Sequence, residues 1–276
     1  MATDEGAMTR REHRGEGLRV AIAQQPMAWT TAENTQHIKN LLTCAADGGA
    51  QICVFPELAL TGFHRGIRDQ ATLCIVEDAF RRVQESCCQH WIACALGMPT
   101  FAGDGAVMNS YVVIAPGGGV ASISSKNGLT PSEQTFFKAG TTRDLVEVEG
   151  RSCASVMCRE IDDVDAIERQ LSSDDVDVIF WPSLVGHPPG TVHATPEDTA
   201  DLGYVERTAV LARRLDAYVV QSNWPQALNT PGSTYHGESK VYAPDGDILL
   251  TLPRDLPGVA ILTLGDREYE WTPSPT

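Results

Sequence analysis

The chain contains 276 residues, with 36 acidic against 21 basic side chains, a formal net charge of -15 and a pI near 4.8. This negative charge repels a phosphate backbone, so we expect no nucleic-acid partner. Every hydrophobic stretch is interrupted before it reaches the roughly 18 apolar residues of a membrane helix, and the polar first eighteen residues lack the apolar core of a secretory signal. The composition therefore predicts a soluble, cytoplasmic protein without membrane association.

Eight cysteines are present, and we expect reduced thiols because they stand in apolar contexts and no export signal precedes them. Cys87, Cys88, His90 and Cys94 are residue types that bind zinc. Adjacent cysteines match none of the usual structural-zinc spacings, so we predict no metal site. The three glycines at 117–119 precede no Gly-Lys-Ser or Gly-Lys-Thr, which argues against a nucleotide-binding loop. We therefore predict no cofactor.

Strands and helices alternate along the first hundred residues. The apolar run 18–25 predicts a buried strand, and residues 32–50 place Ile38, Leu41, Leu42 and Ala45 at helical spacing. By the same criteria, residues 50–57 and 92–101 are predicted strands, and residues 77–91 an amphipathic helix. This alternation is typical of an α/β fold.

Two hairpins are predicted later in the chain. NSYVVIAPGGGVASISS (109–125) and SKVYAPDGDILLTL (239–252) each contain two β-rich runs joined by proline and glycine, and VIAPGGGVAS and VYAPDGDILL are similar enough to be matching hairpins in two related halves. The residues between them predict strands at 152–158, 176–183 and 217–223 and helices at 163–172 and 204–215.

No linker-like stretch divides the chain. We therefore expect one domain spanning residues 18–266, preceded by a disordered polar arm at 1–17 and followed by a C-terminal tail at 267–276.

Three reactive side chains stand where predicted strands end. Glu57 follows the strand ending at Phe55, Lys126 follows the second limb of the first hairpin, and Cys158 closes the strand 152–158. In α/β folds, chemistry is usually carried by strand ends and the loops that follow them. Because the three residues are far apart in sequence, only the fold can bring them to one pocket.

These residues lie within three longer motifs: VFPELALTG (54–62), SKNGLTPSEQTFFKAG (125–140) and SVMCREID (155–162). In this order the motifs resemble those of the nitrilase, or carbon-nitrogen hydrolase, superfamily, and the similarity runs from LRVAIAQQP to the C-terminal hairpin. The resemblance implies an α/β fold of the nitrilase type, a four-layer α-β-β-α sandwich in which two mixed sheets are flanked by helices. It also implies a homodimer or a larger assembly built from dimers.

The resemblance further implies a catalytic triad of Glu57, Lys126 and Cys158, with Glu133 as a second acid that shapes the site and positions the substrate. A free thiol with a pKa of about 8.5 is only a few per cent thiolate at neutral pH, so it needs a neighbouring base or cation. We expect Glu57 to accept the thiol proton, and Lys126 with the backbone N–H of Arg159 to stabilise the oxyanion. Loss of Lys126 should then harm turnover far more than folding.

These roles predict a hydrolase that cleaves a small non-peptide amide or carbamoyl compound through a thioester, releasing ammonia or an amine. The same residues suit two other reactions, nitrile hydrolysis and transfer of the thioester acyl group to an amine. A non-catalytic scaffold with the same fold is the alternative from a different class of protein. It would be favoured if iodoacetamide failed to modify Cys158 in preference to the other seven thiols.

Each site residue also has a purely structural interpretation. Taken alone, Cys158 is a small hydrophobic strand residue, Lys126 a solvated lysine at a hairpin end, and Glu133 an acid favoured early in a helix after Pro131. Glu57 is the least easily explained this way, because acids seldom follow a buried strand without a partner.

Three positions, in two of the motifs, depart from the family pattern. Gly128 stands where many members carry a histidine, and Arg159-Glu160 stand where many carry Tyr-Asp. These departures bear on substrate identity rather than on the triad. Three histidines lie in loops and are expected at the surface: His187, His193 and His236.

Overall fold

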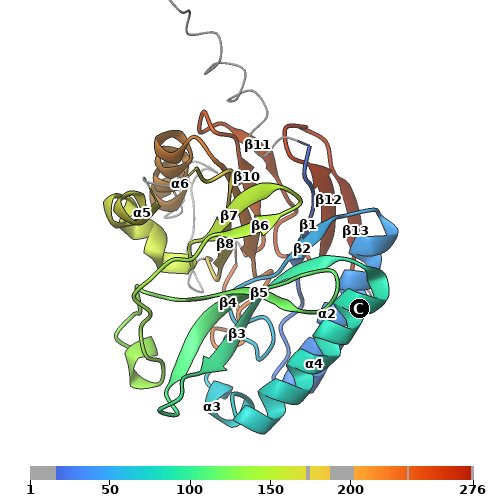
Figure 1. Cartoon of the computed structure of the whole chain (residues 1–276), viewed down its shortest axis with the longest axis vertical. Helices are drawn as coiled ribbons and strands as arrows, with labels where there is room; N and C mark the ends of the chain where they lie inside the picture. The colour runs from blue at the N-terminus through green and yellow to red at the C-terminus, as the bar shows by residue number, and fades with distance from the viewer. Residues whose placement is uncertain (1–16, 172–174, 187–201, 235, 275–276) are drawn as a thin grey trace, which may run out of the picture.

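The computed structural model describes residues 17–171, 175–186, 202–234 and 236–274, which form two β-sheets (Figure 1). The first has seven strands in the spatial order β13 (Glu270–Pro273), β12 (Gly258–Thr263), β1 (Arg19–Gln24), β2 (Ile52–Val54), β3 (Ala93–Phe101), β4 (Val107–Ile114) and β5 (Val120–Ser125). The second has six, in the order β11 (Ile248–Thr251), β10 (Lys240–Tyr242), β9 (Tyr218–Asn223), β8 (Val178–Ser183), β7 (Arg151–Ser155) and β6 (Val146–Val148). The last two strands of the chain thus join the sheet that contains the first strand.

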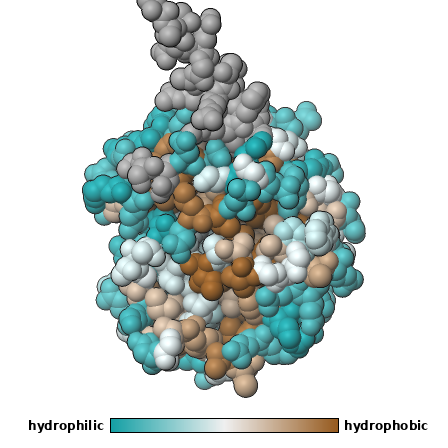
Figure 2. Space-filling view, in the orientation of Figure 1, coloured by the Kyte–Doolittle hydropathy of each residue, from teal (hydrophilic) through white to brown (hydrophobic). Residues whose placement is uncertain are grey.

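Helices cover the outer face of each sheet. α2 (Thr31–Asp47) and α4 (Leu73–His90) pack against the seven-stranded sheet, and α5 (Val164–Leu171) and α6 (Leu202–Leu215) against the six-stranded sheet (Figure 1). Hydrophilic side chains cover the outer surface of α4, as expected for an amphipathic helix (Figure 2). Among the described helices, none is both long and apolar enough to cross a membrane.

The inner faces of the two sheets meet in a shared core. Val20 and Ile22 of β1 point into it together with Val220 of β9, whereas Ala21 and Ala23 of β1 point toward the helix layer. This alternation follows from the two-residue period of a strand with both faces buried. The predicted α/β fold, with two mixed sheets flanked by helices, is confirmed, and its layers follow the order α-β-β-α.

The strand directions position the site. In each sheet three central strands run parallel, β1–β3 in one and β7–β9 in the other, and antiparallel strands extend both sides. Because β4 reverses the direction of β3 and β5 reverses it again, β5 runs parallel to β2. The carboxyl ends of β2 and β5 therefore lie at the same edge of their sheet.

The two predicted hairpins are confirmed as β4–β5 and β10–β11, and their turns match. In each, the alanine before the proline, Ala115 or Ala243, donates its N–H to the carbonyl oxygen four residues later at 2.8 Å. Gly118 and Gly246 have φ angles of 81° and 86°, a region that glycine enters without steric cost. A register shift follows Val113 in one hairpin and Val241 in the other.

The sheet continues beyond the expected domain end at residue 266. Residues 270–273, assigned to a tail by the sequence, form β13 and pair with β12. Trp271 packs against the core between the sheets, and Arg19 Nη2 lies 3.0 Å from Glu270 Oε1. The tail prediction is therefore wrong for this segment. Its apolar contact comes from one half-buried side chain, Trp271, and a single apolar residue gives no periodic pattern in the sequence.

Trp271→Ala should lower the free energy of unfolding by about 2 kcal/mol, because it removes a partly buried aromatic side chain from the sheet edge. Urea denaturation measures the change. Trp91→Ala is the matched control, since Trp91 is 74% exposed and its loss should change stability by less than about 0.5 kcal/mol. Equal effects of the two substitutions would contradict a structural role for β13.

Candidate active site

Three buried charged side chains form the centre of the site. Lys126 Nζ lies 2.6 Å from Glu57 Oε1 and 2.6 Å from Glu133 Oε1. The residues are 1%, 0% and 6% exposed, respectively. Charged groups this deep persist only when they are paired and hydrogen-bonded. One ammonium therefore neutralises part of the charge of two carboxylates, and the three groups together carry a formal charge of -1.

Glu133 is fixed on both sides of its carboxylate. It begins the short helix η1 (Glu133–Thr135), and its Oε2 accepts the N–H of Thr130 at 2.7 Å. The Thr130 hydroxyl oxygen in turn accepts the N–H of Glu133 at 3.1 Å. This reciprocal pair resembles a capping box and directs the second carboxylate oxygen toward Lys126.

Asn109 is a site residue that the sequence did not reveal. Its Nδ2 donates to Glu57 Oε1 at 2.8 Å and lies 3.5 Å from Glu133 Oε1, and the residue is fully buried. Asn109 stands in β4, which was predicted correctly as a strand. An amide in an otherwise apolar strand was the available signal.

Cys158 lies beside this cluster on a turn, not at the end of a strand as predicted. β7 ends at Ser155, and Cys158 begins the short helix η2 (Cys158–Asp162) with a φ of 47°. Left-handed backbone is strained for any residue with a β-carbon and is concentrated at functional sites. Trp181 Nε1 donates to the Cys158 carbonyl oxygen at 3.0 Å and helps to hold this turn.

Cys158 as a whole residue is partly exposed, but its sulfur atom is strongly desolvated. Burial and the negative charge of Glu57 raise the pKa of Cys158 to about 12, although Lys126 and the backbone N–H of Leu184 act in the opposite direction. The resting side chain is therefore a protonated thiol at neutral pH.

The neighbouring charges are perturbed in complementary ways. Burial raises the pKa of Glu57 above its ordinary value, while Lys126 opposes this increase. Burial acts to lower the pKa of Lys126, but Glu57, Cys158 and Glu133 together raise it well above its usual range. The lysine therefore stays charged while the glutamate gains affinity for a proton.

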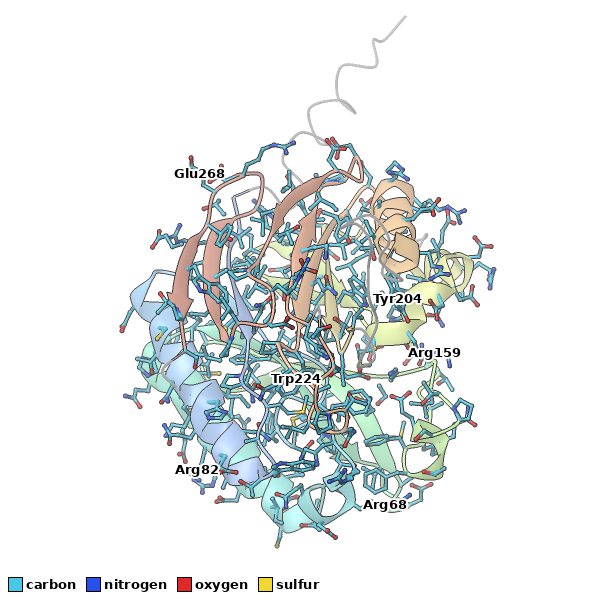
Figure 3. All side chains as sticks on the ribbon, turned by 180° about the vertical axis from the view of Figure 1, so that it is seen from behind. Arg68, Arg82, Arg159, Tyr204, Trp224 and Glu268 are labelled. Atoms are coloured by element: carbon cyan, nitrogen blue, oxygen red, sulfur yellow. The ribbon has the colours of Figure 1, made fainter. Side chains whose placement is uncertain are left out.

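Close backbone packing sets the position of Glu57. A β-carbon on Gly97 would lie 2.4 Å from both Leu58 N and Pro56 O, so only glycine lets β3 approach the Glu57 loop this closely. Leu58 has a φ of 54°, and Trp224 Nε1 donates to the Glu57 carbonyl oxygen at 2.8 Å. Figure 3 shows Trp224 near the middle of the molecule.

Arg159 lies beside the thiol in sequence, and its side chain lines a cavity of about 340 Å³ together with Asn127, Gly128 and Glu160. In Figure 3, Arg159 lies away from Trp224, on the same side of the molecule as Tyr204. Its backbone N–H is at the start of η2, where a helix leaves its first N–H groups without intrahelical acceptors.

The predicted surface histidines have different outcomes. His187 and His193 lie outside the described residues. His236 is only 4% exposed, with Nδ1 3.1 Å from Val185 O and Nε2 2.9 Å from Ser233 Oγ. The surface prediction is therefore wrong for His236, because its ring packs against the bare backbone of Gly186.

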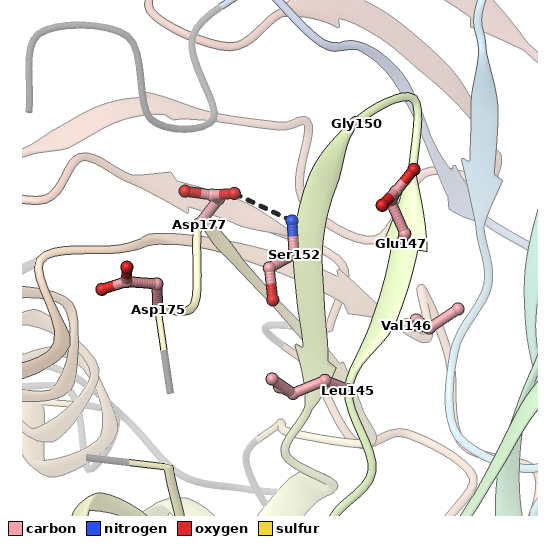
Figure 4. Close-up of a pocket in the computed structure, with 7 residues that line it drawn as sticks. All are labelled: Leu145, Val146, Glu147, Gly150, Ser152, Asp175 and Asp177. Carbon is pink, nitrogen blue, oxygen red and sulfur yellow. Dashed lines mark hydrogen bonds between the residues drawn. The ribbon is translucent and has the colours of Figure 1, made fainter. Parts of the chain in front are cut away.

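Two further cavities differ in their relation to the charged cluster. One of about 250 Å³ includes Glu133 and is also lined by Phe63, Phe136, Arg65 and Arg68. Another of about 500 Å³ lies at the β6–β7 hairpin and shares no lining residue with the cluster (Figure 4). Of these two cavities, the one next to Glu133 therefore includes a residue of the charged cluster.

The four candidate zinc ligands do not form a metal site in the described part of the chain. Cys87 of α4 and Cys94 of β3 are buried in the core, whereas Cys88 is exposed. Burial raises the pKa of the Cys94 thiol well above its usual value, which disfavours the thiolate that zinc requires.

Residues 19–272 match the family model described as carbon-nitrogen hydrolase. The chain belongs to the carbon-nitrogen hydrolase family. Its membership of the nitrilase superfamily, predicted from the three motifs, is confirmed, and with it the prediction of an enzyme that hydrolyses carbon–nitrogen bonds.

Two relatives of this carbon-nitrogen hydrolase match it over most of the chain at low sequence identity. Omega-amidase YafV of Escherichia coli K12 is 24% identical over 244 residues, which is 85% of each chain. A cysteine-to-alanine mutant of the Nesterenkonia AN1 amidase has a TM-score of 0.78 at 18% identity, covering 92% of this chain and 93% of that one. A glutamate-to-glutamine mutant of the same amidase, with the acetamide moiety of fluoroacetamide added covalently at the active-site cysteine, has a TM-score of 0.77 at 18% identity and covers 91% and 92%. These structures share the fold.

The burial of Lys126 with Glu57 and Glu133 changes the expected effect of a Lys126 substitution on the stability of this carbon-nitrogen hydrolase. Lys126→Ala leaves two buried carboxylates without their counterion, so it should lower the free energy of unfolding by about 3–5 kcal/mol at pH 7. The earlier expectation that this loss would harm turnover far more than folding is thus revised. The loss should shrink as pH falls, because burial raises the pKa of Glu57 and this carboxyl takes up a proton more readily in the folded than in the unfolded chain.

Urea denaturation at several pH values measures this effect. Lys138→Ala is the matched control, because Lys138 pairs with Asp104 at 3.0 Å while both side chains are 59% exposed. Its cost should not exceed about 1 kcal/mol. A Lys126→Ala variant as stable as this control would contradict the buried cluster.

Proposed function

We propose that this enzyme hydrolyses a small non-peptide amide or carbamoyl compound through a thioester on Cys158, with release of ammonia or an amine. The observation that carries the proposal is the buried ammonium of Lys126 between two carboxylates, beside a desolvated thiol. The relatives named as amidases support the amide as substrate class. A cytoplasmic location and a homodimeric assembly stay predictions.

In the first half-reaction, the Cys158 sulfur attacks the carbonyl carbon while Glu57 accepts the thiol proton. The Lys126 ammonium and the Arg159 backbone N–H stabilise the oxyanion. Glu57 then gives the proton to the departing nitrogen as the C–N bond breaks, which leaves an acyl thioester and free ammonia or amine. Loss of one oxyanion donor typically costs on the order of 3 kcal/mol of transition-state stabilisation.

In the second half-reaction, Glu57 accepts a proton from water as the water oxygen attacks the thioester carbonyl. The C–S bond breaks, the sulfur regains its proton from Glu57, and a carboxylic acid is released. The same carboxylate thus serves as base and acid in both halves. Glu133 keeps Lys126 oriented and charged throughout.

The perturbed pKa values support proton transfer during attack rather than before it. A thiol with a pKa of about 12 is almost entirely protonated at neutral pH, so sulfur becomes nucleophilic only as Glu57 takes the proton. Burial raises the pKa of Glu57, which makes its carboxylate a stronger base.

We place the acyl part of the substrate in the cavity of about 250 Å³ beside Glu133. Phe63 and Phe136 supply apolar lining, and the guanidinium of Arg68 lies over the Phe136 ring at 4.7 Å. Within the described residues, neither Arg65 nor Arg68 forms a salt bridge, although the chain carries an excess of acid. These cations favour a substrate whose far end is polar or anionic.

The proposal predicts ammonia release from amides by the wild type, and a loss of at least about 10⁴-fold in kcat/KM in Cys158→Ala and in Glu57→Gln. Ammonia release is measured across a screen of amides, carbamoyl compounds and nitriles. The screen includes pairs of compounds of equal length, of which one carries a distal carboxylate and the other does not. Cys74→Ala is the control, because Cys74 is an exposed free thiol outside the cluster. Unchanged turnover in Cys158→Ala would contradict the nucleophile.

The same screen separates the alternatives. Ammonia from nitriles alone would identify a nitrilase, and a new amide formed with an added amine would identify acyl transfer. No turnover of any compound by the wild type would favour a scaffold. Iodoacetamide preference is a poorer test than first expected, because Cys74 and Cys88 are exposed while Cys158 is desolvated.

The pH dependence of kcat/KM should have an acid limb above the ordinary glutamate pKa of about 4.3, because Glu57 has a raised pKa and cannot accept a proton once it is protonated. Activity is therefore lost as pH falls through this raised value. Lys126 should add no alkaline limb near neutrality, because its pKa is shifted upward. An acid limb at or below the ordinary glutamate value would contradict Glu57 as the base.

A further inference from the structure

Glu160, two residues after Cys158, connects the loop that carries Lys126 to the loop that carries Cys158. Its Oε1 accepts the backbone N–H of Asn127 at 2.6 Å and of Gly128 at 3.1 Å, immediately after Lys126 in the chain. Its Oε2 accepts the backbone N–H of Met157 at 2.7 Å, immediately before Cys158. One carboxylate thus binds the backbone that follows Lys126 and the backbone that precedes Cys158.

The carboxylate is itself fixed from behind. Arg143 Nη1 lies 3.0 Å from Glu160 Oε2, and the two side chains are 5% and 3% exposed. Arg143 also donates to the Ser155 carbonyl oxygen and to Gln170 Oε1. Charge-assisted hydrogen bonds are stronger than neutral ones, so Glu160 has little freedom to move.

Gly128 makes room for this arrangement. A β-carbon at this position would lie 3.2 Å from Glu160 Cγ, which is closer than ordinary van der Waals contact. The φ of Gly128 lies outside the left-handed region, so space rather than backbone conformation requires the glycine. Gly128 and Glu160, which both depart from the family pattern, are therefore in direct contact.

We propose that Glu160 is a positioning residue that couples the Lys126 loop to the Cys158 loop, and that Gly128 is glycine because a β-carbon there would press against the Glu160 side chain. Four donors resist movement of Glu160, so an added β-carbon moves the backbone at 128 instead. That movement reaches Lys126, two residues earlier. The inference rests on the proposed roles of Lys126 and Cys158 and adds a residue through which their separation is set.

The test is Gly128→Ala, compared with Gly117→Ala. A β-carbon on Gly117 meets no atom within 4 Å, and its φ also lies outside the left-handed region, so it is a matched control. We expect Gly128→Ala to lower kcat on the order of tenfold with little change in KM, because a misplacement well below 1 Å reaches the reacting groups. The urea midpoint of unfolding should stay close to that of the control. A merely structural role would lower the midpoint and leave kcat unchanged.

A double-mutant cycle with Glu160→Ala tests the coupling. Because alanine at 160 lacks the contacting Cγ, Gly128→Ala should then cost less than about twofold in kcat. Independent, multiplying effects would overturn the proposal. If Glu160→Ala does not fold because Arg143 loses its buried counterion, Gly128→Ala decides alone, and a kcat equal to that of Gly117→Ala overturns the inference.

A substrate-independent measurement separates this inference from the proposed function. The rate of iodoacetamide modification at the Cys158 peptide, followed by mass spectrometry against pH, reports how Lys126 and Glu57 act on the thiol. Gly128→Ala should shift this pH profile, and Gly117→Ala should not. An unshifted profile overturns the coupling even where amides are hydrolysed, whereas a shifted profile without turnover of any amide overturns only the proposed function.

Discussion

The ion cluster of Lys126, Glu57 and Glu133 is the constraint on which the rest of the site depends. A single ammonium at 2.6 Å from two buried carboxylates is stable only if its position is held closely, since removal of the ammonium leaves both carboxylates uncompensated. Glu57 is far in the sequence from the motif that carries both Lys126 and Glu133, so the fold has to bring these two segments together. Asn109, Thr130 and the indole of Trp224 supply the neutral hydrogen bonds that hold them there.

The two-sheet architecture explains how such distant residues meet. The carboxyl ends of β2 and β5 share one edge of the first sheet, which brings Glu57 and Lys126 together, and the second sheet supplies Cys158 after β7. The close approach at Gly97 and the contact between Gly128 and Glu160 show that the loops pack tightly at these two points. In such packing, small displacements are passed from one loop to the next.

Sequence reasoning succeeded where a local pattern carries the information. Apolar periodicity predicted the central strands and main helices, proline and glycine predicted both hairpins, and three motifs predicted the superfamily. It failed where a single tertiary contact decides. The left-handed backbone of Cys158, the bond from Asn109 to Glu57 and the burial of His236 each depend on a partner far away in the chain. β13 was missed because Trp271 alone anchors a strand of otherwise polar residues.

The electrostatics of the cluster also restrict when sulfur becomes reactive. Burial and Glu57 raise the pKa of Cys158, while the positive charge of Lys126 is already shared by two carboxylates and lowers it only in part. A resting thiolate would compete with those carboxylates for the same ammonium. In the proposed reaction, an oxyanion forms at a bound carbonyl only as Glu57 becomes neutral by accepting the thiol proton, so the net charge around Lys126 stays constant through the attack. Constant charge in a desolvated site limits reorganisation, and the proposed reaction thereby gives a physical role to one lysine paired with two glutamates next to a protonated cysteine.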